Sequence, residues 1–211
     1  MLPRKDRYSH VLTWFAENMR NAKSELNFRN PYELLVAVML SAQCTDKRVN
    51  QVTPALFERY PDVFSLAKGS EEEILKYINS VSYPNAKAQH LLQMAQIVAD
   101  KCDGIIPSTM DALTSLPGVG RKTASVMLAV AFGKPAMPVD THVFRVSHRV
   151  GLAEEAKNPL QTEMILRQYI PEEILSDAHH WLLLHGRYVC TALAPKCEEC
   201  GIREYCKEFK E

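Results

Sequence analysis

The stretch LPGVGRKTA, residues 116–124, places two glycines two residues apart and follows them directly with Arg121 and Lys122. Glycine adopts backbone conformations and permits close approaches that a side chain would block, so Gly118 and Gly120 predict a tight turn. The apolar pattern of DALTSL before the turn and KTASVMLAVAF after it predicts a helix on each side. The glycines of this helical hairpin either serve packing or present free amides to an anion such as a DNA phosphate.

The rest of the chain carries further helix signals. Asn30-Pro31 predicts a cap followed by proline at the first helical position, and the apolar run YELLVAVMLSAQC predicts a buried helix that includes Cys44. Similar starts lie at residues 70–73, 108–111 and 158–159, and one apolar helical face is formed by Tyr8, Val11, Leu12, Phe15 and Met19. We find no βαβ rhythm and predict an all-α fold of about nine to eleven short helices.

The charges of the chain balance at 25 Lys and Arg against 25 Asp and Glu, so no global field draws it to nucleic acid or an anionic membrane. Residues 114–151 are nevertheless locally basic. Their only acid is Asp140, and their basic residues are Arg121, Lys122, Lys134, Arg145 and Arg149. This block is either a solvated face or a local contact for nucleic acid.

The N-terminal segment MLPRKDRYSHVLTWF is interrupted by charged residues and does not read as a signal peptide. The longest apolar run, residues 34–42, falls short of the roughly 20 residues that a membrane span needs. We therefore expect a cytoplasmic protein. In that reducing compartment the six cysteines are not expected to form three disulfides.

The C-terminal tail holds four cysteines in a C-x6-C-x2-C-x5-C pattern: Cys190, Cys197, Cys200 and Cys206. Four thiolates so close in sequence suit either tetrahedral zinc or an iron-sulfur cluster. Zinc sites more often use two C-x2-C pairs, whereas one pair flanked by longer, unequal spacings favours a [4Fe-4S] cluster. Cys44 and Cys102 stand apart and are expected to be core or surface thiols.

Lys122 falls in the first turn of its helix, where the helix dipole disfavours the protonated amine and so favours a nucleophilic one. The helix over residues 121–132 rises roughly 18 Å at about 1.5 Å per residue. Residues 133–139 can span about 23 Å when extended, so the chain can return Asp140 to the helix start, beside Lys122. Asp140-Thr141-His142 also resembles a helix cap, which leaves a catalytic and a capping role open.

Together LPGVGRKTA, VDTHVFRV, HHWLLLHGRYVC and the cysteine tail resemble the endonuclease III family of helix-hairpin-helix DNA glycosylases, over nearly the whole chain. The resemblance implies a two-lobed fold with DNA in the cleft between the lobes. It implies a six-helix barrel domain over residues 22–134, with the helix-hairpin-helix at about 108–132. Residues 1–21 and 135–211 would form a discontinuous [4Fe-4S] cluster domain.

The family's chemistry implies that Lys122 is the nucleophile and Asp140 the carboxylate that assists it. The implied activity is that of a bifunctional DNA glycosylase and AP lyase of base excision repair. It would remove oxidised pyrimidines through a Schiff base and nick the strand by β-elimination. Cys190, Cys197 and the C-terminal pair Cys200 and Cys206 would bind a [4Fe-4S] cluster that shapes a DNA-contacting loop. The partner would be duplex DNA with a damaged pyrimidine or an abasic site, bound by a monomer near the bacterial nucleoid.

The resemblance also suggests DNA contacts outside the catalytic pair. Gln43 matches the glutamine that enters the gap left by the flipped base. Family members present a leucine in a segment resembling GLYNSKA, whereas this chain reads SYPNAKA and places Tyr83 at the leucine, where an aromatic ring could act as a wedge. Further candidate contacts are Gly118, Val119, Gly120, Arg121, His142 and Lys196.

Two other functions compete with this one. A monofunctional mismatch or adenine glycosylase of the same superfamily would remove a base without cutting the strand, but such enzymes typically lack a lysine at position 122. A non-catalytic helix-hairpin-helix DNA-binding or redox-signalling protein would use the cluster alone. The joint presence of Lys122 and Asp140 argues against that second alternative, since phosphate binding needs neither.

Overall fold

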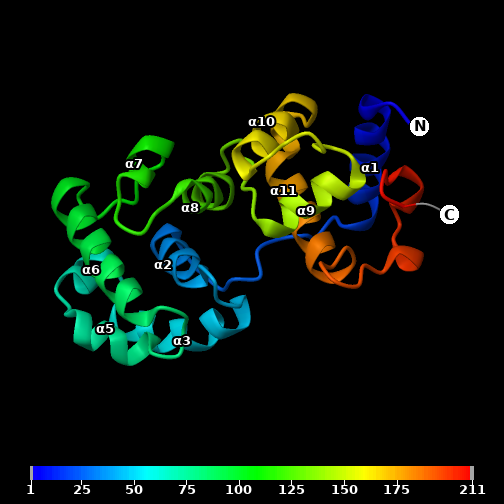
Figure 1. The fold of residues 1–211 in the computed structure, drawn as a ribbon. Helices are drawn as coiled ribbons and strands as arrows, with labels where there is room; N and C mark the ends of the chain where they lie inside the picture. Colours follow the sequence, from blue (N-terminus) through cyan, green and yellow to red (C-terminus); the bar gives the residue numbers. More distant parts are fainter. Residues whose placement is uncertain (1, 210–211) are drawn as a thin grey trace. The chain divides into compact units, whose positions relative to one another are not determined.

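The computed structural model describes residues 2–209, and within them the chain forms eleven α-helices and no strand (Figure 1). The helices are α1 (Arg4–Asn18), α2 (Pro31–Ser41), α3 (Asp46–Arg59), α4 (Val63–Ala67), α5 (Glu71–Ile78), α6 (Pro84–Lys101), α7 (Met110–Thr114), α8 (Arg121–Val126), α9 (Thr141–Val150), α10 (Pro159–Tyr169) and α11 (Leu175–Tyr188). A π-helix, η1 (Met127–Ala131), continues α8. The shorter 3₁₀ turns are η2 (Glu172–Ile174), η3 (Cys197–Glu199) and η4 (Arg203–Tyr205). The predicted all-α fold is confirmed.

The chain divides into two compact units. One runs over Ser24–Gly133 and contains the glycine hairpin, so we call it the hairpin unit. The other combines Met1–Lys23 with Lys134–Glu211, and we call it the terminal unit.

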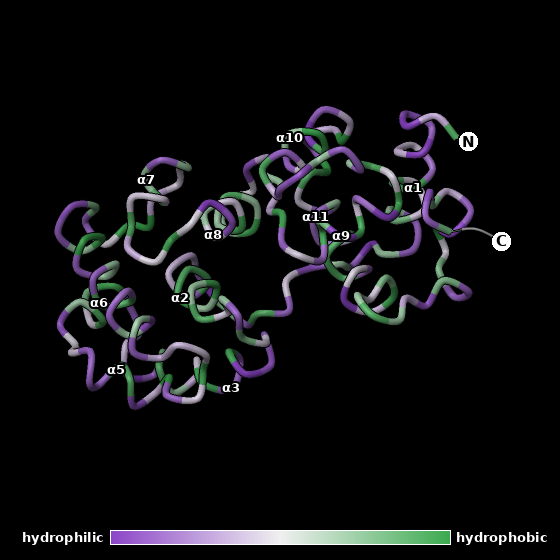
Figure 2. The backbone as a smooth tube through the Cα atoms, viewed as in Figure 1, coloured by the Kyte–Doolittle hydropathy of each residue, from purple (hydrophilic) through white to green (hydrophobic). Residues whose placement is uncertain are grey.

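The centre of the hairpin unit is α2, which packs against α3, α6, α8 and η1. Its residues from Tyr32 to Leu40 are buried, and hydrophobic colouring runs along this helix in Figure 2. The helix begins where the sequence predicts, because the side chain of Asn30 accepts a hydrogen bond from the Glu33 amide and Pro31 occupies the first helical position. The apolar run therefore forms the buried helix that organises this unit.

Three local predictions for the hairpin unit are wrong in detail. The buried helix ends at Ser41, so Cys44 lies in the following turn and is partly exposed. The cap before α7 is Thr109, one residue later than the cap-like Ser108, because the Thr109 side chain accepts from the Ala112 amide. The helix predicted over residues 121–132 is α-helical only as far as Val126 and then widens into η1.

The terminal unit is built on α1, α9, α10 and α11, with α9 packed on α11. Three of the residues predicted to share the buried face of α1 are in its core: Tyr8, Val11 and Phe15. Leu12 and Met19 are partly buried at the edge of that core. The predicted cap at Asn158 is also present, since its side chain accepts from the Gln161 amide.

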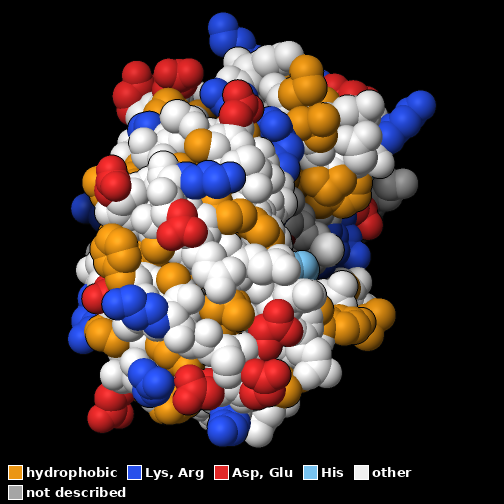
Figure 3. Space-filling model, turned by 90° about the vertical axis from the view of Figure 1, so that its left-hand side faces the viewer, with side chains coloured by type: hydrophobic (Ala, Val, Ile, Leu, Met, Phe, Trp, Pro, Cys, Tyr) orange, Lys and Arg blue, Asp and Glu red, His pale blue; other side chains and the backbone are white. Residues whose placement is uncertain are grey.

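The surface carries both signs of charge. On the face shown in Figure 3, Lys and Arg side chains are interspersed with Asp and Glu side chains, in keeping with the balance of 25 against 25. None of the helices in the described residues combines the length and the apolar character that a membrane crossing requires.

Candidate functional site

The turn between α7 and α8 has a conformation that only glycine accommodates easily. Gly118 has φ +75°, and a Cβ atom there would lie 2.8 Å from the Cβ of His90 and 3.0 Å from the Cε of Met39. The side chain of Val119 is buried, and its amide donates to the Leu116 carbonyl across the turn. The turn is thus anchored from inside the hairpin unit.

The outer side of the same turn is open. A Cβ atom at Gly120 would meet nothing within 4 Å. The amides of Gly118 and Gly120 donate to no acceptor in the described part of the chain, whereas the Val119 amide is already engaged. Of the three amides that the sequence suggests for a phosphate, the two glycine amides are therefore the available donors.

Lys122 follows this turn as the second residue of α8. Its side chain is exposed and makes no hydrogen bond or ion pair with any described residue. Arg121, directly before it, is exposed as well. The amine of Lys122 is therefore accessible and unencumbered, as a nucleophile requires.

Asp140 is the N-cap of α9 in the terminal unit. Its Oδ1 atom accepts hydrogen bonds from the amides of His142, at 2.9 Å, and Val143, at 2.8 Å. The capping role suggested by the sequence is thus real, and it holds the carboxylate in one orientation. Neither cap hydrogen bond uses Oδ2, which remains available to a substrate or a second group. Because Lys122 and Asp140 belong to different units, their pairing stays a prediction.

The two residues expected to enter the DNA gap share an unusual backbone. Gln43 has φ +53° and Tyr83 has φ +55°, in the left-handed region that non-glycine residues rarely occupy. Both side chains are exposed, that of Tyr83 by 67%. Left-handed strain costs about 1–3 kcal/mol per residue and persists only where the surrounding structure imposes it. Because both residues are exposed, core packing does not account for this strain, and both stay candidates for DNA contact.

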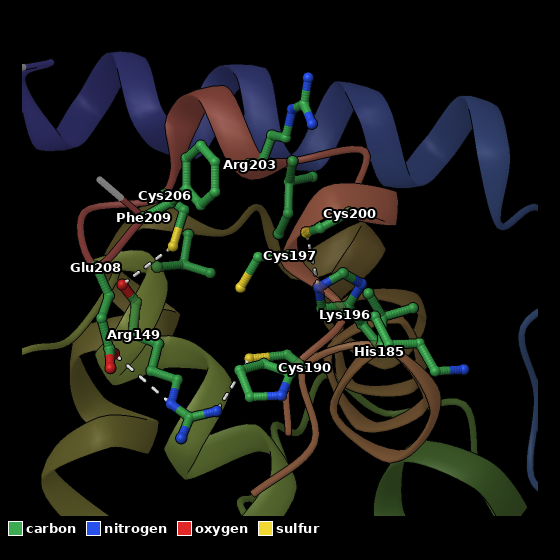
Figure 4. Close-up of a pocket in the computed structure, with 14 residues that line it drawn as sticks. Arg149, His185, Cys190, Lys196, Cys197, Cys200, Arg203, Cys206, Glu208 and Phe209 are labelled. Carbon is green, nitrogen blue, oxygen red and sulfur yellow. Dashed lines mark hydrogen bonds and ion pairs between the residues drawn. The ribbon is translucent and has the colours of Figure 1, made fainter. Parts of the chain in front are cut away.

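The four tail cysteines surround one cavity in the terminal unit. Figure 4 shows their sulfur atoms directed toward a shared space, which has a volume of about 380 Å³. The segment reaches this arrangement through the turns η3 and η4, which lie between the second and third and between the third and fourth cysteines. None of the six cysteines, all of which lie within residues 2–209, is paired in a disulfide.

The size of this cavity favours the larger of the two candidate metal groups. One water molecule takes up about 30 Å³ of liquid, and four thiolates at about 2.3 Å would close tightly around a single zinc ion. A cavity of about 380 Å³ has room for a group of several atoms. Burial raises the pKa of the Cys200 and Cys206 thiols, so ligation must displace their protons, as thiophilic metals do. The residues present therefore fit a polynuclear iron-sulfur cluster.

Two arginines on α9 hold the first part of this cysteine segment, whereas the sequence suggested only that they belong to a solvated face or a nucleic-acid contact. Arg145 donates to the carbonyls of Gly186 and Cys190, at 2.7 and 3.1 Å. Arg149, one turn later, donates to the carbonyls of Thr191 and Ala192, at 2.7 and 3.0 Å. The helix that begins at Asp140 thus also fixes the loop after Cys190. The i,i+4 spacing of the two arginines was a signal for a shared face.

The other end of the cysteine segment rests on α1. The buried guanidinium of Arg7 donates to the carbonyls of Tyr205 and Gly151, and the ring of His10 stacks on Tyr205 with centroids 4.7 Å apart. Trp14 packs directly against Gly201. Residues 7, 10 and 14 lie on one face of α1, and this face therefore supports the chain around the last two cysteines.

The remaining candidate contacts are surface or half-buried residues of the terminal unit. Lys196 is exposed, and its amide donates to the Val189 carbonyl at 2.9 Å, which closes the loop between the first two cysteines. His142 is half-buried, with Nδ1 3.2 Å from the Nη2 atom of Arg145.

Burial lowers the pKa of His185 to about 4, so this imidazole is neutral beside Cys200, 3.5 Å from its sulfur.

Comparison with known proteins identifies the family. A model of the HhH-GPD superfamily of base excision DNA repair proteins matches residues 36–172, and a model of the iron-sulfur binding domain of endonuclease III matches residues 190–206. Endonuclease III of Rickettsia felis is 46% identical over 92% of this chain and 91% of its own length. A trapped covalent intermediate of endonuclease III with DNA has a TM-score of 0.93 and 42% identity, covering 99% of this chain and 97% of that one. A thermostable thymine-DNA glycosylase has a TM-score of 0.84 and 26% identity, covering 97% and 95%. The chain thus belongs to the endonuclease III family, within the HhH-GPD superfamily, and the segment that holds its four tail cysteines matches that family's iron-sulfur binding domain.

Proposed function

We propose that this chain, a base excision repair DNA glycosylase and AP lyase, excises oxidised pyrimidines from duplex DNA with Lys122 as its nucleophile. The observation that carries the proposal is the exposed, unpartnered amine of Lys122 directly after a turn with two free amides. The endonuclease III relative of 42% identity is trapped covalently on DNA, which supports a covalent route. Since its substrate is genomic DNA, we expect the enzyme to act at the bacterial nucleoid.

The reaction begins when the damaged nucleotide leaves the stack, because C1′ cannot be reached inside a duplex. The Nζ atom of Lys122 forms a bond to C1′, and the C1′–N bond breaks, so that the base departs with its electron pair and takes up a proton. The sugar ring opens to a Schiff base. Loss of the C2′ proton then expels the 3′ phosphate by β-elimination, which nicks the strand. Water finally hydrolyses the imine and frees the lysine.

The other site residues are proposed to hold the DNA and assist Lys122. The amides of Gly118 and Gly120 bind a phosphate, supported by Val119 inside the turn and Arg121 beside it. His142 and Lys196 contact the backbone from the terminal unit. Cys190, Cys197, Cys200 and Cys206 would hold a [4Fe-4S] cluster, which would cross-link the loop that presents Lys196. In this proposal Ser24–Gly133 corresponds to the predicted six-helix barrel and the terminal unit to the cluster domain, and the enzyme acts as a monomer.

Asp140 is proposed to accept a proton from Lys122 and to stabilise positive charge that develops on the sugar. Asp140→Asn should lower single-turnover excision of thymine glycol by about 10²- to 10⁴-fold, the usual contribution of a positioned acid-base group. Asparagine caps a helix as well as aspartate does, so α9 and the unfolding temperature should be preserved. A variant that melts normally and excises at the wild-type rate would show that Asp140 is only a cap.

The decisive experiment is trapping with borohydride. Duplex DNA with a thymine glycol or an abasic site is incubated with the protein and sodium borohydride, and denaturing gels are read for a protein-DNA adduct. We expect an adduct with both substrates and a nick at the lesion. Base release without an adduct would instead indicate the monofunctional alternative. Light scattering of the enzyme with one duplex should give one chain per DNA.

A further inference from the structure

The C-terminal end of α2 and the N-terminal end of α6 lie together in the hairpin unit. A residue with a strained backbone follows the first helix, and another precedes the second. Gln43 comes two residues after α2 ends at Ser41, and Tyr83 comes directly before α6 begins at Pro84. Only three non-glycine residues in the described chain have positive φ, and these are two of them. Something must hold both turns in this conformation.

The first connection between the two turns is made by Lys87. This residue lies in the first turns of α6, and only 8% of it is exposed. Its Nζ atom donates to the carbonyls of Leu40 and Ala42, both at 2.8 Å. Carbonyls at the end of a helix have no intrahelical partner, and an ammonium there also interacts favourably with the helix dipole. Lys87 therefore caps α2 from a neighbouring helix and fixes the chain just before Gln43.

The second connection is direct. The Oγ atom of Ser82 donates to the carbonyl of Gln43 at 2.7 Å. Because Ser82 directly precedes Tyr83, this hydrogen bond links the turn that holds Tyr83 to the turn that holds Gln43. Lys87 and Ser82 thus hold Gln43 and Tyr83 from two sides. Their three hydrogen bonds join residues that are 39, 45 and 47 positions apart in the sequence.

We propose that Lys87 and Ser82 are positioning residues that hold Gln43 and Tyr83 as a single preformed wedge, which fills the stack when the damaged base leaves it. The inference rests on the proposed insertion of Gln43 and Tyr83 and adds the residues through which that insertion is preorganised. A wedge that is already ordered loses little conformational freedom on entering DNA. If the turns relax from the left-handed region, the two side chains separate and base extrusion becomes slow.

The two substrates of the enzyme distinguish this role from a general structural one. Excision of thymine glycol requires extrusion of a base, whereas an abasic site has no base to unstack, so its extrusion is easier. Displacing catalytic or positioning groups by about 1 Å can cost about 10²-fold in rate. Lys87→Met keeps the length of the side chain but has no donor. It should lower kcat/KM for thymine glycol by about 10- to 100-fold while nicking of abasic DNA falls by less than about 3-fold.

A fluorescent base reports extrusion without relying on turnover. With 2-aminopurine placed opposite thymine glycol, wild-type protein should raise the fluorescence as the opposite base is unstacked, and Lys87→Met should lose most of that rise. Ser82→Ala, at a partly buried residue that supplies a single hydrogen bond, should show the same split to a smaller degree. Lys101→Met is the matched control, because it removes an exposed lysine from the far end of the same helix.

The possible outcomes distinguish a failure of the positioning role from a failure of the proposed insertion. If Gln43→Ala and Tyr83→Ala excise thymine glycol normally, the proposed insertion is wrong. If those two variants are impaired but Lys87→Met and Ser82→Ala behave like Lys101→Met, the positioning role is overturned. Equal losses on both substrates would also overturn it, because they indicate a fold defect. Should Lys87→Met fail to fold by circular dichroism, Ser82→Ala decides the question alone.

Discussion

Lys122→Ala should abolish the borohydride-trapped adduct and lower strand nicking at an abasic site by roughly 10⁴- to 10⁶-fold, the scale seen when a catalytic nucleophile is removed. Alanine has no atom that can form a bond to C1′, so neither the Schiff base nor the β-elimination that depends on it is possible. The side chain is exposed and makes no contact that the fold needs, so the unfolding temperature should be unchanged. Gel analysis of trapping and of nicking measures both effects.

The control for this variant is Lys68→Ala, which removes another exposed lysine of the hairpin unit. It should trap and nick like the wild type. Lys122→Ala should also bind undamaged duplex about as well as the wild type, because its proposed role is chemical and the phosphate contact belongs to the glycine amides. Persistent trapping in Lys122→Ala would move the nucleophile to another amine and sink the mechanism proposed above.

Gly201→Ala should remove most of the iron from the protein. A Cβ atom at this position would lie 2.0 Å from the Cζ2 atom of Trp14 and 2.3 Å from its Cε2 atom, far inside van der Waals contact. The indole ring belongs to the edge of the core and cannot withdraw freely, so the chain between Cys200 and Ile202 must move. That movement takes Cys200 away from the cavity and adds about 1–3 kcal/mol of overpacking strain.

Iron and sulfide analysis, visible absorbance and urea unfolding measure this effect. Gly120→Ala is the matched control for iron content, because a Cβ atom there meets nothing within 4 Å. Trp14→Ala in the Gly201→Ala background should restore part of the iron, since it removes the atoms that clash. Full iron loading of Gly201→Ala would show that α1 does not set the position of the third cysteine.

Local sequence signals predicted helix starts more reliably than helix ends. Asn30 and Asn158 were identified as caps because each forms its hydrogen bond to an amide three residues away, within one short segment. The end of α2 was misplaced because the sequence before Cys44 carries no clear signal that a helix ends. The helix ends at Ser41, and the side chain of Lys87, on another helix, caps it by donating to the Leu40 carbonyl. Helix ends of this kind depend on partners that lie far away in the sequence.

The candidate site shows the same difference between features that the local sequence suggests and features that only the fold reveals. Lys122, Asp140 and the four cysteines could be proposed from the sequence, because their residue types and spacings suggest a chemistry and match motifs of the family that the chain resembles. The availability of the Gly118 and Gly120 amides, in contrast with that of Val119, became visible only in the folded turn. The left-handed strain of Gln43 and Tyr83 was equally invisible, because no sequence pattern reports a backbone that its neighbours force.

The sequence by itself thus determined the all-α class, and it predicted the hairpin, the candidate nucleophile and the candidate ligand set, since each of these signals lies within a short segment of the chain. Only the tertiary structure decided what holds these groups in place. Arg7 reaches Tyr205 across 198 positions, and Arg145 reaches Cys190 across 45. Such contacts form between surfaces that are brought together by burial of the core, and a side chain's partner there is set by the packing of whole helices, not by its neighbours in the chain.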